Sequence, residues 1–103
     1  MDLTMVSSSP LHLRVAFAPG DSCFHGHFPD NPVVPGSLVM ALCLDCLRTH
    51  TEKDAPLTIR RFSFARFARP GTYDLIIERS GEAYLCLLRR GSEIFAQGRI
   101  RPW

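Results

Sequence analysis

The sequence predicts an α+β fold in which a curved antiparallel sheet wraps around one long central helix. Three observations indicate this class. One strand-like segment precedes a long irregular loop, an apolar helix candidate follows the loop, and the second half of the chain alternates apolar and polar residues between regularly spaced turns. With 103 residues, 46% of them hydrophobic, we expect a single domain over residues 1–103 with a real core.

The first expected strand covers residues 11–17, where every second residue is a large apolar one. A loop over residues 18–36 follows. Its last thirteen residues, 24–36, contain three prolines, two glycines and two histidines, and the prolines exclude regular structure. Because a loop of this length in a small domain usually has a function, we expect the functional site here.

The helix candidate covers residues 37–49, and only four residues interrupt its apolar character: Ser37, Asp45, Arg48 and Thr49. A helix that is apolar almost all round is buried on most sides. In a chain this short, only a sheet that wraps around the helix can bury it in that way.

A polar connection over residues 50–56 leads from the helix to four expected strands, which cover residues 57–68, 73–78, 83–89 and 94–101. The turns between them contain glycine, at residues 69–71, 80–82 and 90–92. Turns spaced by about ten residues are typical of an antiparallel meander.

Composition excludes several classes of protein. The net charge of +2 is too small to imply nucleic-acid binding. The chain has no signal-peptide pattern, and its longest apolar run, residues 38–44, is too short to span a membrane. We therefore expect a cytoplasmic protein with reduced cysteines. We interpret Cys43 and Cys46 as core thiols, and the spacing of cysteines and histidines matches no standard zinc site, so we expect no metal.

The junction between the loop and the helix carries the clearest chemical signal. Gly36 stands where the helix is expected to begin, and the first N–H groups of a helix have no partner within it. His27 lies nine residues upstream in the same shaped loop. A base close to a preorganised donor for a carbonyl oxygen is suited to enolate chemistry.

The residues of this junction resemble a known family. The stretch Gly26-His27-Phe28-Pro29, followed by Pro32-Val33-Val34-Pro35-Gly36, is similar to the signature of the β-hydroxyacyl-(acyl carrier protein) dehydratases of the FabA/FabZ type. A weaker similarity continues through Phe64 and residues 66–71, so that the resemblance covers roughly residues 11–101, with its strong part in 24–40. That family has the hot-dog fold, in which an antiparallel sheet wraps around a helix.

The resemblance implies a set of roles. His27 would act as the base that moves the α-proton of a 3-hydroxyacyl thioester, and the N–H of Gly36 would polarise the thioester carbonyl. Phe28 and Pro35, in the same motif, would contact the substrate. An acid on the first turns of the helix, contributed across a dimer interface, would protonate the departing hydroxyl. No metal or redox cofactor is implied, since the acyl group arrives on the phosphopantetheine of an acyl carrier protein.

The sequence departs from the family pattern at the acid. In the family this residue lies fourteen positions after the histidine, and that count from His27 reaches Ala41. The nearest acid on the helix is Asp45, about 6 Å further along the axis. Three alternatives follow: Asp45 replaces the missing acid, a second subunit supplies it in a mixed dimer, or the chain keeps binding without catalysis.

Four arginines close together in sequence are a further candidate for binding: Arg60, Arg61, Arg66 and Arg69. They form either an ordinary solvated strand face or a docking patch for the acidic carrier protein and its phosphate, to which arginine is well suited.

The function that the sequence favours is a FabZ-like 3-hydroxyacyl-(acyl carrier protein) dehydratase, working as a homodimer or as a heterodimer with another hot-dog subunit. The first alternative is a non-catalytic subunit that pairs with a complete dehydratase chain, which Ala41 favours. The second is a hot-dog acyl thioesterase, against which the Pro-Val-Val-Pro-Gly loop argues.

Overall fold

The computed structural model describes residues 1–24, 32–51 and 56–102. Within them the chain forms six strands and one α-helix in the order β1 (Asp2–Ser8), β2 (Leu11–Phe17), α1 (Gly36–His50), β3 (Leu57–Phe64), β4 (Gly71–Ser80), β5 (Ala83–Arg90) and β6 (Glu93–Pro102). A short 3-10 turn, η1 (Ser22–Phe24), stands in the loop after β2. This architecture confirms the predicted α+β hot-dog fold.

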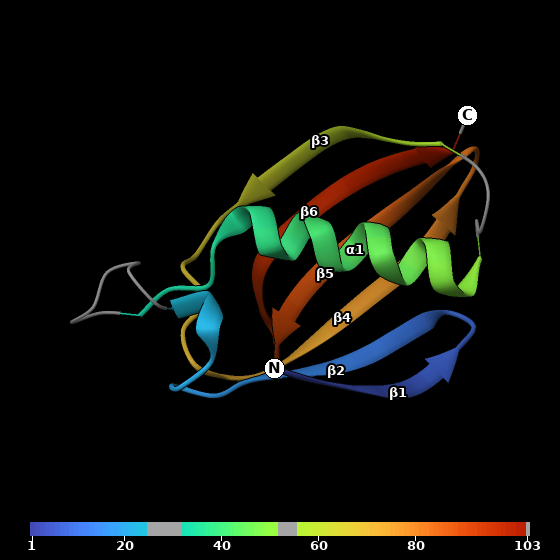
Figure 1. Cartoon of the computed structure of the whole chain (residues 1–103). Coiled ribbons are helices and arrows are strands. Elements are labelled where there is room, and N and C mark those ends of the chain that lie inside the picture. Colours follow the sequence, from blue (N-terminus) through green and yellow to red (C-terminus); the bar gives the residue numbers. More distant parts are fainter. Residues whose placement is uncertain (25–31, 52–55, 103) are drawn as a thin grey trace.

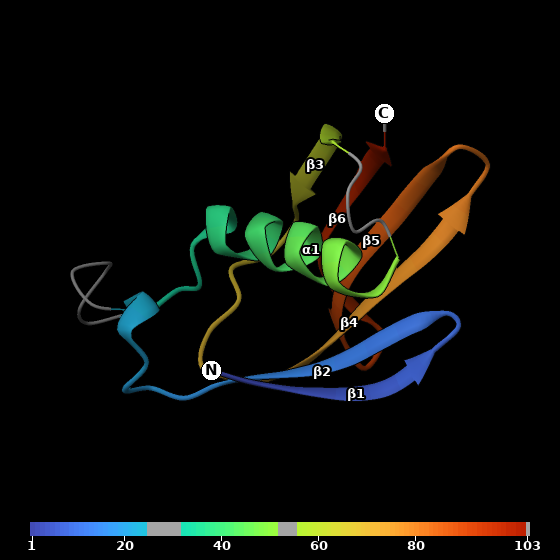
Figure 2. The same ribbon diagram turned by 45° about the vertical axis from the view of Figure 1, so that its right-hand side comes forward.

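The six strands form one antiparallel sheet in the order β1-β2-β4-β5-β6-β3. Figures 1 and 2 show the sheet curving around α1, with β1 and β2 along one side of the helix and β3 along the other. The sheet therefore has an inner face that packs on α1 and an outer face that no helix in the described ranges covers.

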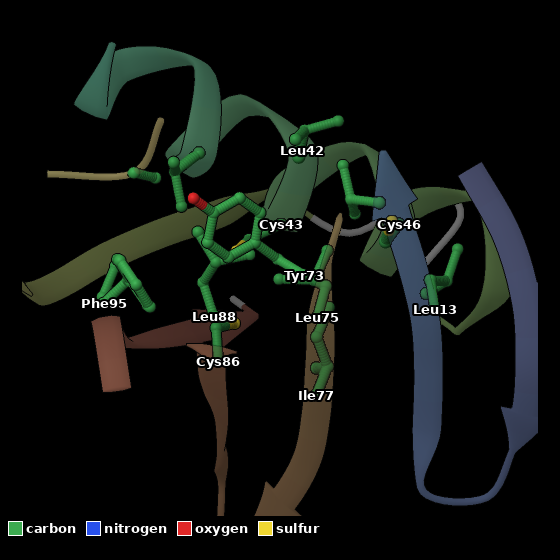
Figure 3. Close-up of a cluster of buried hydrophobic side chains, with 14 of the residues drawn as sticks. Leu13, Leu42, Cys43, Cys46, Tyr73, Leu75, Ile77, Cys86, Leu88 and Phe95 are labelled. Carbon is green, nitrogen blue, oxygen red and sulfur yellow. The ribbon is translucent and has the colours of Figure 1, made fainter. Parts of the chain in front are cut away.

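The core lies between α1 and the inner face of the sheet (Figure 3). The helix contributes Val39, Leu42, Cys43, Cys46 and Leu47, all buried. Opposite them, inward-facing residues of the strands are buried in turn, among them Leu13, Tyr73, Leu75, Cys86 and Leu88. Alternation along the strands therefore produces the core, as the sequence pattern predicted.

The helix is buried or half-buried over most of its circumference, as expected, but it has one open side. Ser37, Ala41 and Asp45 recur at intervals of four residues, and all are exposed. The sheet of one chain encloses only part of the helix circumference, which is why this stripe is uncovered. Over the described ranges, no helix is both long enough and apolar enough to cross a bilayer.

The strand β1 is the element that the sequence analysis did not predict. It pairs only with β2 and lies at an edge of the sheet, where six of its seven residues are exposed. Leu3 and Met5 stand opposite Val15 and Leu13, yet they remain 45% and 44% exposed because α1 does not reach them. Met1, Leu3 and Met5 do alternate with Asp2 and Thr4, a short strand signal that the sequence analysis did not use.

The strand β3 also differs from its prediction, since it ends at Phe64 rather than at residue 68. Its aromatic side chains stack, with the ring centroids of Phe62 and Phe64 5.4 Å apart. The ring of Phe62 lies over Gly98, its direct partner on β6, at a place where a Cβ atom on residue 98 would clash. Glycine at this position therefore lets β3 close the sheet against the core.

Candidate functional site

A cavity of about 420 Å³ lies at the N-terminal end of α1. The loop before the helix, the chain that leaves β3, and strands β5 and β6 form its walls: Val33, Val34, Pro35, Gly36, Ser37, Val39, Phe64, Arg66, Phe67, Ala68, Leu88, Phe95 and Ala96. Apolar and aromatic side chains dominate this lining. Three residues that the sequence analysis selected are among them: Pro35, Gly36 and Arg66.

The start of α1 presents unused N–H groups to this cavity. Pro35 is extended, with φ −60° and ψ 137°, and its carbonyl accepts hydrogen bonds from the N–H groups of Leu38 (3.0 Å) and Val39 (3.3 Å). The N–H groups of Gly36 and Ser37 precede these bonds, so they have no partner within the helix, and no side chain caps this end of it. These donors, at the positive end of the helix, suit a carbonyl or oxyanion.

Gly36 also makes a close packing contact. A Cβ atom at residue 36 would lie 2.9 Å from Cζ of Phe64, whose ring closes this side of the cavity. Glycine therefore admits the ring without displacing it, and it leaves the N–H accessible. Phe64 and Phe67 are 47% and 71% exposed, so aromatic surface lies at the cavity mouth.

Backbone hydrogen bonds hold the segment between β3 and β4 in place as a wall of the cavity. The N–H groups of Ala65 (2.9 Å) and Arg66 (3.3 Å) both donate to the carbonyl of Phe95. The N–H of Val34 donates to the carbonyl of Ala68 (2.7 Å), which ties this wall to the loop before the helix.

The hydroxyl of Tyr73 fixes the other end of the same wall. It donates to the carbonyl of Arg69 (2.7 Å) and accepts from the Arg69 N–H (2.9 Å). The ring of Tyr73 is buried, meets Phe95 edge-on at 5.0 Å, and carries the guanidinium of Arg90 over it at 5.1 Å. The position of the wall is therefore set by the core.

The carboxylate of Asp45 is far from this cavity within one chain. Asp45 follows Gly36 by nine residues, which corresponds to about 13 Å along the helix axis. Ala41 is nearer to the helix start, but neither residue lines the cavity, and both belong to the open side of α1. None of the described residues that line the cavity carries a carboxylate.

His27 and Phe28 lie outside the described residues, so their predicted roles stay predictions. The described residues nearest to them in sequence are Phe24, which is buried, and Pro32.

The structure divides the four predicted arginines between two places. Arg66 lines the cavity and pairs with Glu93 at 3.3 Å, both side chains being more than half exposed. Arg69 is exposed in the same segment, whereas Arg60 and Arg61 line a separate groove on the sheet. The four arginines are close in sequence but do not form one patch, because the chain leaves the sheet after Phe64.

The cysteines on α1 are free and buried, as expected for core thiols. Hydrogen bonding to Cys86, followed by burial, holds the pKa of the Cys43 thiol far above its usual range. Burial raises the pKa of the Cys46 thiol to about 11. Such thiols are neutral and unreactive near pH 7. Among the described residues, no group of three cysteine, histidine or acidic side chains could hold a metal ion.

The sequence analysis missed the aromatic residues that complete the cavity. Phe95 comes from β6, about sixty residues after Gly36, and reaches the site only because β5 and β6 pair beside the helix. Phe67 could have been found, since it stands in the stretch of residues 66–71 that resembles the dehydratases, but it was assigned to the end of the expected strand over residues 57–68.

Comparison with known proteins gives one family and several similar folds. A model of the ApeI-like family, described as ApeI dehydratase, matches residues 4–95. No curated protein matches the chain. The solved dehydratase heterocomplex ApeI:P from Xenorhabdus doucetiae is 20% identical, with a TM-score of 0.84 over 99% of this chain and 98% of that one.

Two further solved structures share the fold. An uncharacterized protein from Erwinia carotovora subsp. atroseptica is 18% identical, with a TM-score of 0.73 over 100% of this chain and 90% of that one. A candidate thioesterase, a phenylacetic acid degradation-related protein from Ralstonia eutropha, is 20% identical, with a TM-score of 0.61 over 98% and 82%.

Proposed function

This chain belongs to the ApeI-like dehydratase family, and from that premise we propose that it takes part in removing water from a 3-hydroxyacyl thioester. The acyl group would be carried on the phosphopantetheine of an acyl carrier protein, and the product would be the trans-2-enoyl thioester. The apolar cavity at the N-terminus of α1 supports this proposal, because an acyl chain can occupy it while its thioester carbonyl approaches Gly36.

In the proposed reaction the N–H of Gly36 donates to the thioester oxygen and stabilises the negative charge that develops there. His27 removes the proton from C2. The electron pair forms the C2–C3 double bond, and the hydroxyl on C3 leaves as water after it receives a proton from an acid. This scheme needs no cofactor, because the thioester itself makes the C2 proton acidic.

The acid is the part that this chain does not bring to the cavity within its described residues. Ala41 occupies the position where the dehydratase pattern has an acid, and the open side of α1 leaves that position accessible to another chain. We therefore propose that a second hot-dog subunit supplies the acid across an interface on this side of the helix. The ApeI:P assembly is itself a heterocomplex, which supports such a pairing.

The carrier protein would approach at the mouth of the cavity. Arg66 and Arg69 are exposed in the wall between β3 and β4, and guanidinium groups pair well with phosphate and carboxylates. Arg60 and Arg61 lie apart from this mouth, so the proposed carrier-binding patch consists of Arg66 and Arg69.

The test is a hydration assay, which runs the reaction in reverse on a crotonyl-type thioester. We expect the isolated chain to be nearly inactive, because a missing general acid costs on the order of 10²–10⁴-fold in rate. Mixing it with a dehydratase chain that carries an acid at the position of Ala41 should restore turnover.

His27→Ala in this chain then separates two roles within the mixed complex. Loss of turnover with an intact complex would assign the base to this chain. Unchanged turnover would make the chain a non-catalytic subunit, which is the alternative that Ala41 also favours.

A further inference from the structure

A shallow groove of about 600 Å³ lies on the outer face of the sheet, away from α1 and from the cavity at its N-terminus. It extends from β3 across β6 and β5 to β4, and its lining is Arg60, Arg61, Ser63, Ile76, Glu78, Leu85, Cys86, Leu87, Gln97, Gly98 and Arg99. Nothing in the proposed dehydration uses this groove.

The strand register arranges the outward side chains of the groove in two rows across the sheet. The first row runs Arg61, Arg99, Leu85, Glu78, and the second runs Ser63, Gln97, Leu87, Ile76. Both rows change in the same direction, from polar or cationic groups on β3 and β6 to apolar groups on β5. The groove therefore has a cationic end and an apolar floor.

A bulge in β3 strengthens the cationic end. The register of β3 against β6 shifts between Ile59 and Arg61, which leaves Arg60 as an extra residue. Consecutive side chains on a regular strand point to opposite faces, but here Arg60 and Arg61 both line the groove. Together with Arg99 they place three guanidinium groups at one end.

These positive charges are not balanced within the described chain. Arg61 and Arg99 are direct cross-strand partners, an arrangement of like charges that destabilises a sheet. No described carboxylate forms an ion pair with Arg60, Arg61 or Arg99. A bound anion would relieve this repulsion.

The other end of the groove suits a hydrocarbon chain. Leu85 is 40% exposed, and Ile76, although 8% exposed, forms the floor beside Leu87. Glu78 closes the far end and repels a second anionic group. From β3 to β4 is three strand spacings, or about 14 Å, which accommodates a molecule with one charged end and a chain of medium length.

We propose that this groove binds a single-chain amphiphile with a carboxylate head. The carboxylate lies between Arg61 and Arg99, and the chain lies across Leu85 towards Ile76. A second copy of this chain is a poor occupant, because its own groove offers only one carboxylate, that of Glu78, against three guanidinium groups. A uniformly acidic polypeptide is disfavoured by Glu78.

The experiment is an NMR titration of the ¹⁵N-labelled chain with decanoate, kept below its micelle concentration. We expect saturable shifts of the amide signals of Arg61, Leu85 and Arg99. Arg61→Gln and Arg99→Gln should each weaken binding by about tenfold or more, as loss of a charge-assisted hydrogen bond implies. Acetate, which lacks the chain, and decanol, which lacks the charge, should bind more weakly than decanoate.

The matched control is Arg14→Gln, which removes the same charge from β2 on the outer face, outside the groove, and should leave binding unchanged. The proposal is overturned if Arg14→Gln weakens binding as much as Arg61→Gln does, or if neither groove variant has an effect. Signals that shift only around the cavity at Gly36 would overturn it too. An acidic helical peptide that binds the groove while decanoate does not would assign the groove to a protein partner instead.

Discussion

Gly98 is the residue at which a missing side chain matters most to the packing of the sheet. The ring of Phe62 occupies the space that a Cβ atom would need, directly across the β3–β6 pair. The packing of β3 against β6 therefore depends on the absence of a side chain at residue 98.

We predict that Gly98→Ala lowers the free energy of unfolding by about 1–3 kcal/mol, as overpacking does elsewhere. The measurement is urea denaturation followed by circular dichroism. Gly20→Ala is the control, since nothing lies within 4 Å of a Cβ atom there, and it should change stability little. Adding Phe62→Leu to Gly98→Ala should recover part of the loss. A fully additive double variant would contradict the proposed contact.

Ala41 and Asp45 differ by one helical turn on the open side of α1, and this turn decides which acid can act. We predict that Asp45→Asn changes turnover of the mixed complex by less than about twofold, because proton transfer requires closer placement than one turn allows. Ala41→Glu should raise the hydration activity of the isolated chain by about tenfold or more, since it restores an acid at the family position.

Both effects are measured by steady-state hydration of an enoyl thioester, and both substituted positions are exposed, so the fold should be retained. Complete loss of activity in Asp45→Asn would show instead that Asp45 has taken over as the acid.

At the scale of the element, α1 combines a buried face rich in thiols with an open face. The thiol of Cys46 has its pKa raised by burial from an ordinary 9.0 to about 11. Between pH 9 and about pH 11 the Cys46 thiol is therefore deprotonated in the unfolded chain but still protonated in the folded chain. The contribution of this thiol to stability is therefore complete below pH 9 and is lost as the pH rises through about 11.

We predict that the free energy of unfolding falls more steeply with pH above 9 in the wild type than in Cys46→Ala, by at most about 1.4 kcal/mol per pH unit. Urea titrations at a series of pH values give the two slopes. The comparison concerns the slopes alone, because the substitution itself lowers stability at every pH. Parallel curves would mean that Cys46 ionises normally in the folded chain.

The elements themselves could largely be predicted from the sequence, because burial of one face gives a helix or strand a periodic pattern of apolar residues. The predicted strand over residues 11–17 coincides with β2, and the predicted helix over 37–49 is α1 but for one residue at each end. β1 has only a short alternation over residues 1–5, which the sequence analysis did not use. The bulge at Arg60 was also invisible, because it depends on the register with β6.

The site could be predicted only where it is local in sequence. The motif predicts Pro35 and Gly36 as neighbours in one site, and both line the cavity, because the loop and the helix start are contiguous. Phe95 and Arg99 could not be assigned to a site, since strand pairing brings them there. Arg60 and Arg61 are separated from Arg66 and Arg69 because β3 ends at Phe64. The alternation of apolar and polar residues did not reveal this end.

At the scale of the whole molecule, one chain leaves apolar surface uncovered at both edges of its sheet. Leu3, Met5 and Val6 are 44–47% exposed on β1, and Phe64 is 47% exposed at the end of β3. Edge strands also present unpaired backbone groups. Together with the open side of α1, this surface is the basis on which we predict assembly with a further subunit.

We predict that light scattering at micromolar concentration gives at least twice the mass of the 103-residue chain, either with itself or with another hot-dog subunit. Ser37→Arg on the open side of α1 should reduce association, whereas Arg14→Gln on the outer face should not. A stable monomer in the presence of the partner subunit would contradict this prediction.

The hydrogen bonds of the wall between β3 and β4 also bear on how the chain tolerates changes of length. Surface connections usually accept insertions and deletions, because few of their backbone groups are fixed. Here the backbone of four residues forms hydrogen bonds that fix it: Ala65 and Arg66 with Phe95, Ala68 with Val34, and Arg69 with Tyr73. One residue more or fewer would shift the carbonyl that holds Val34, and with it the start of α1. The spacing from Phe64 to Gly71 is therefore as much a part of the site as any side chain in it.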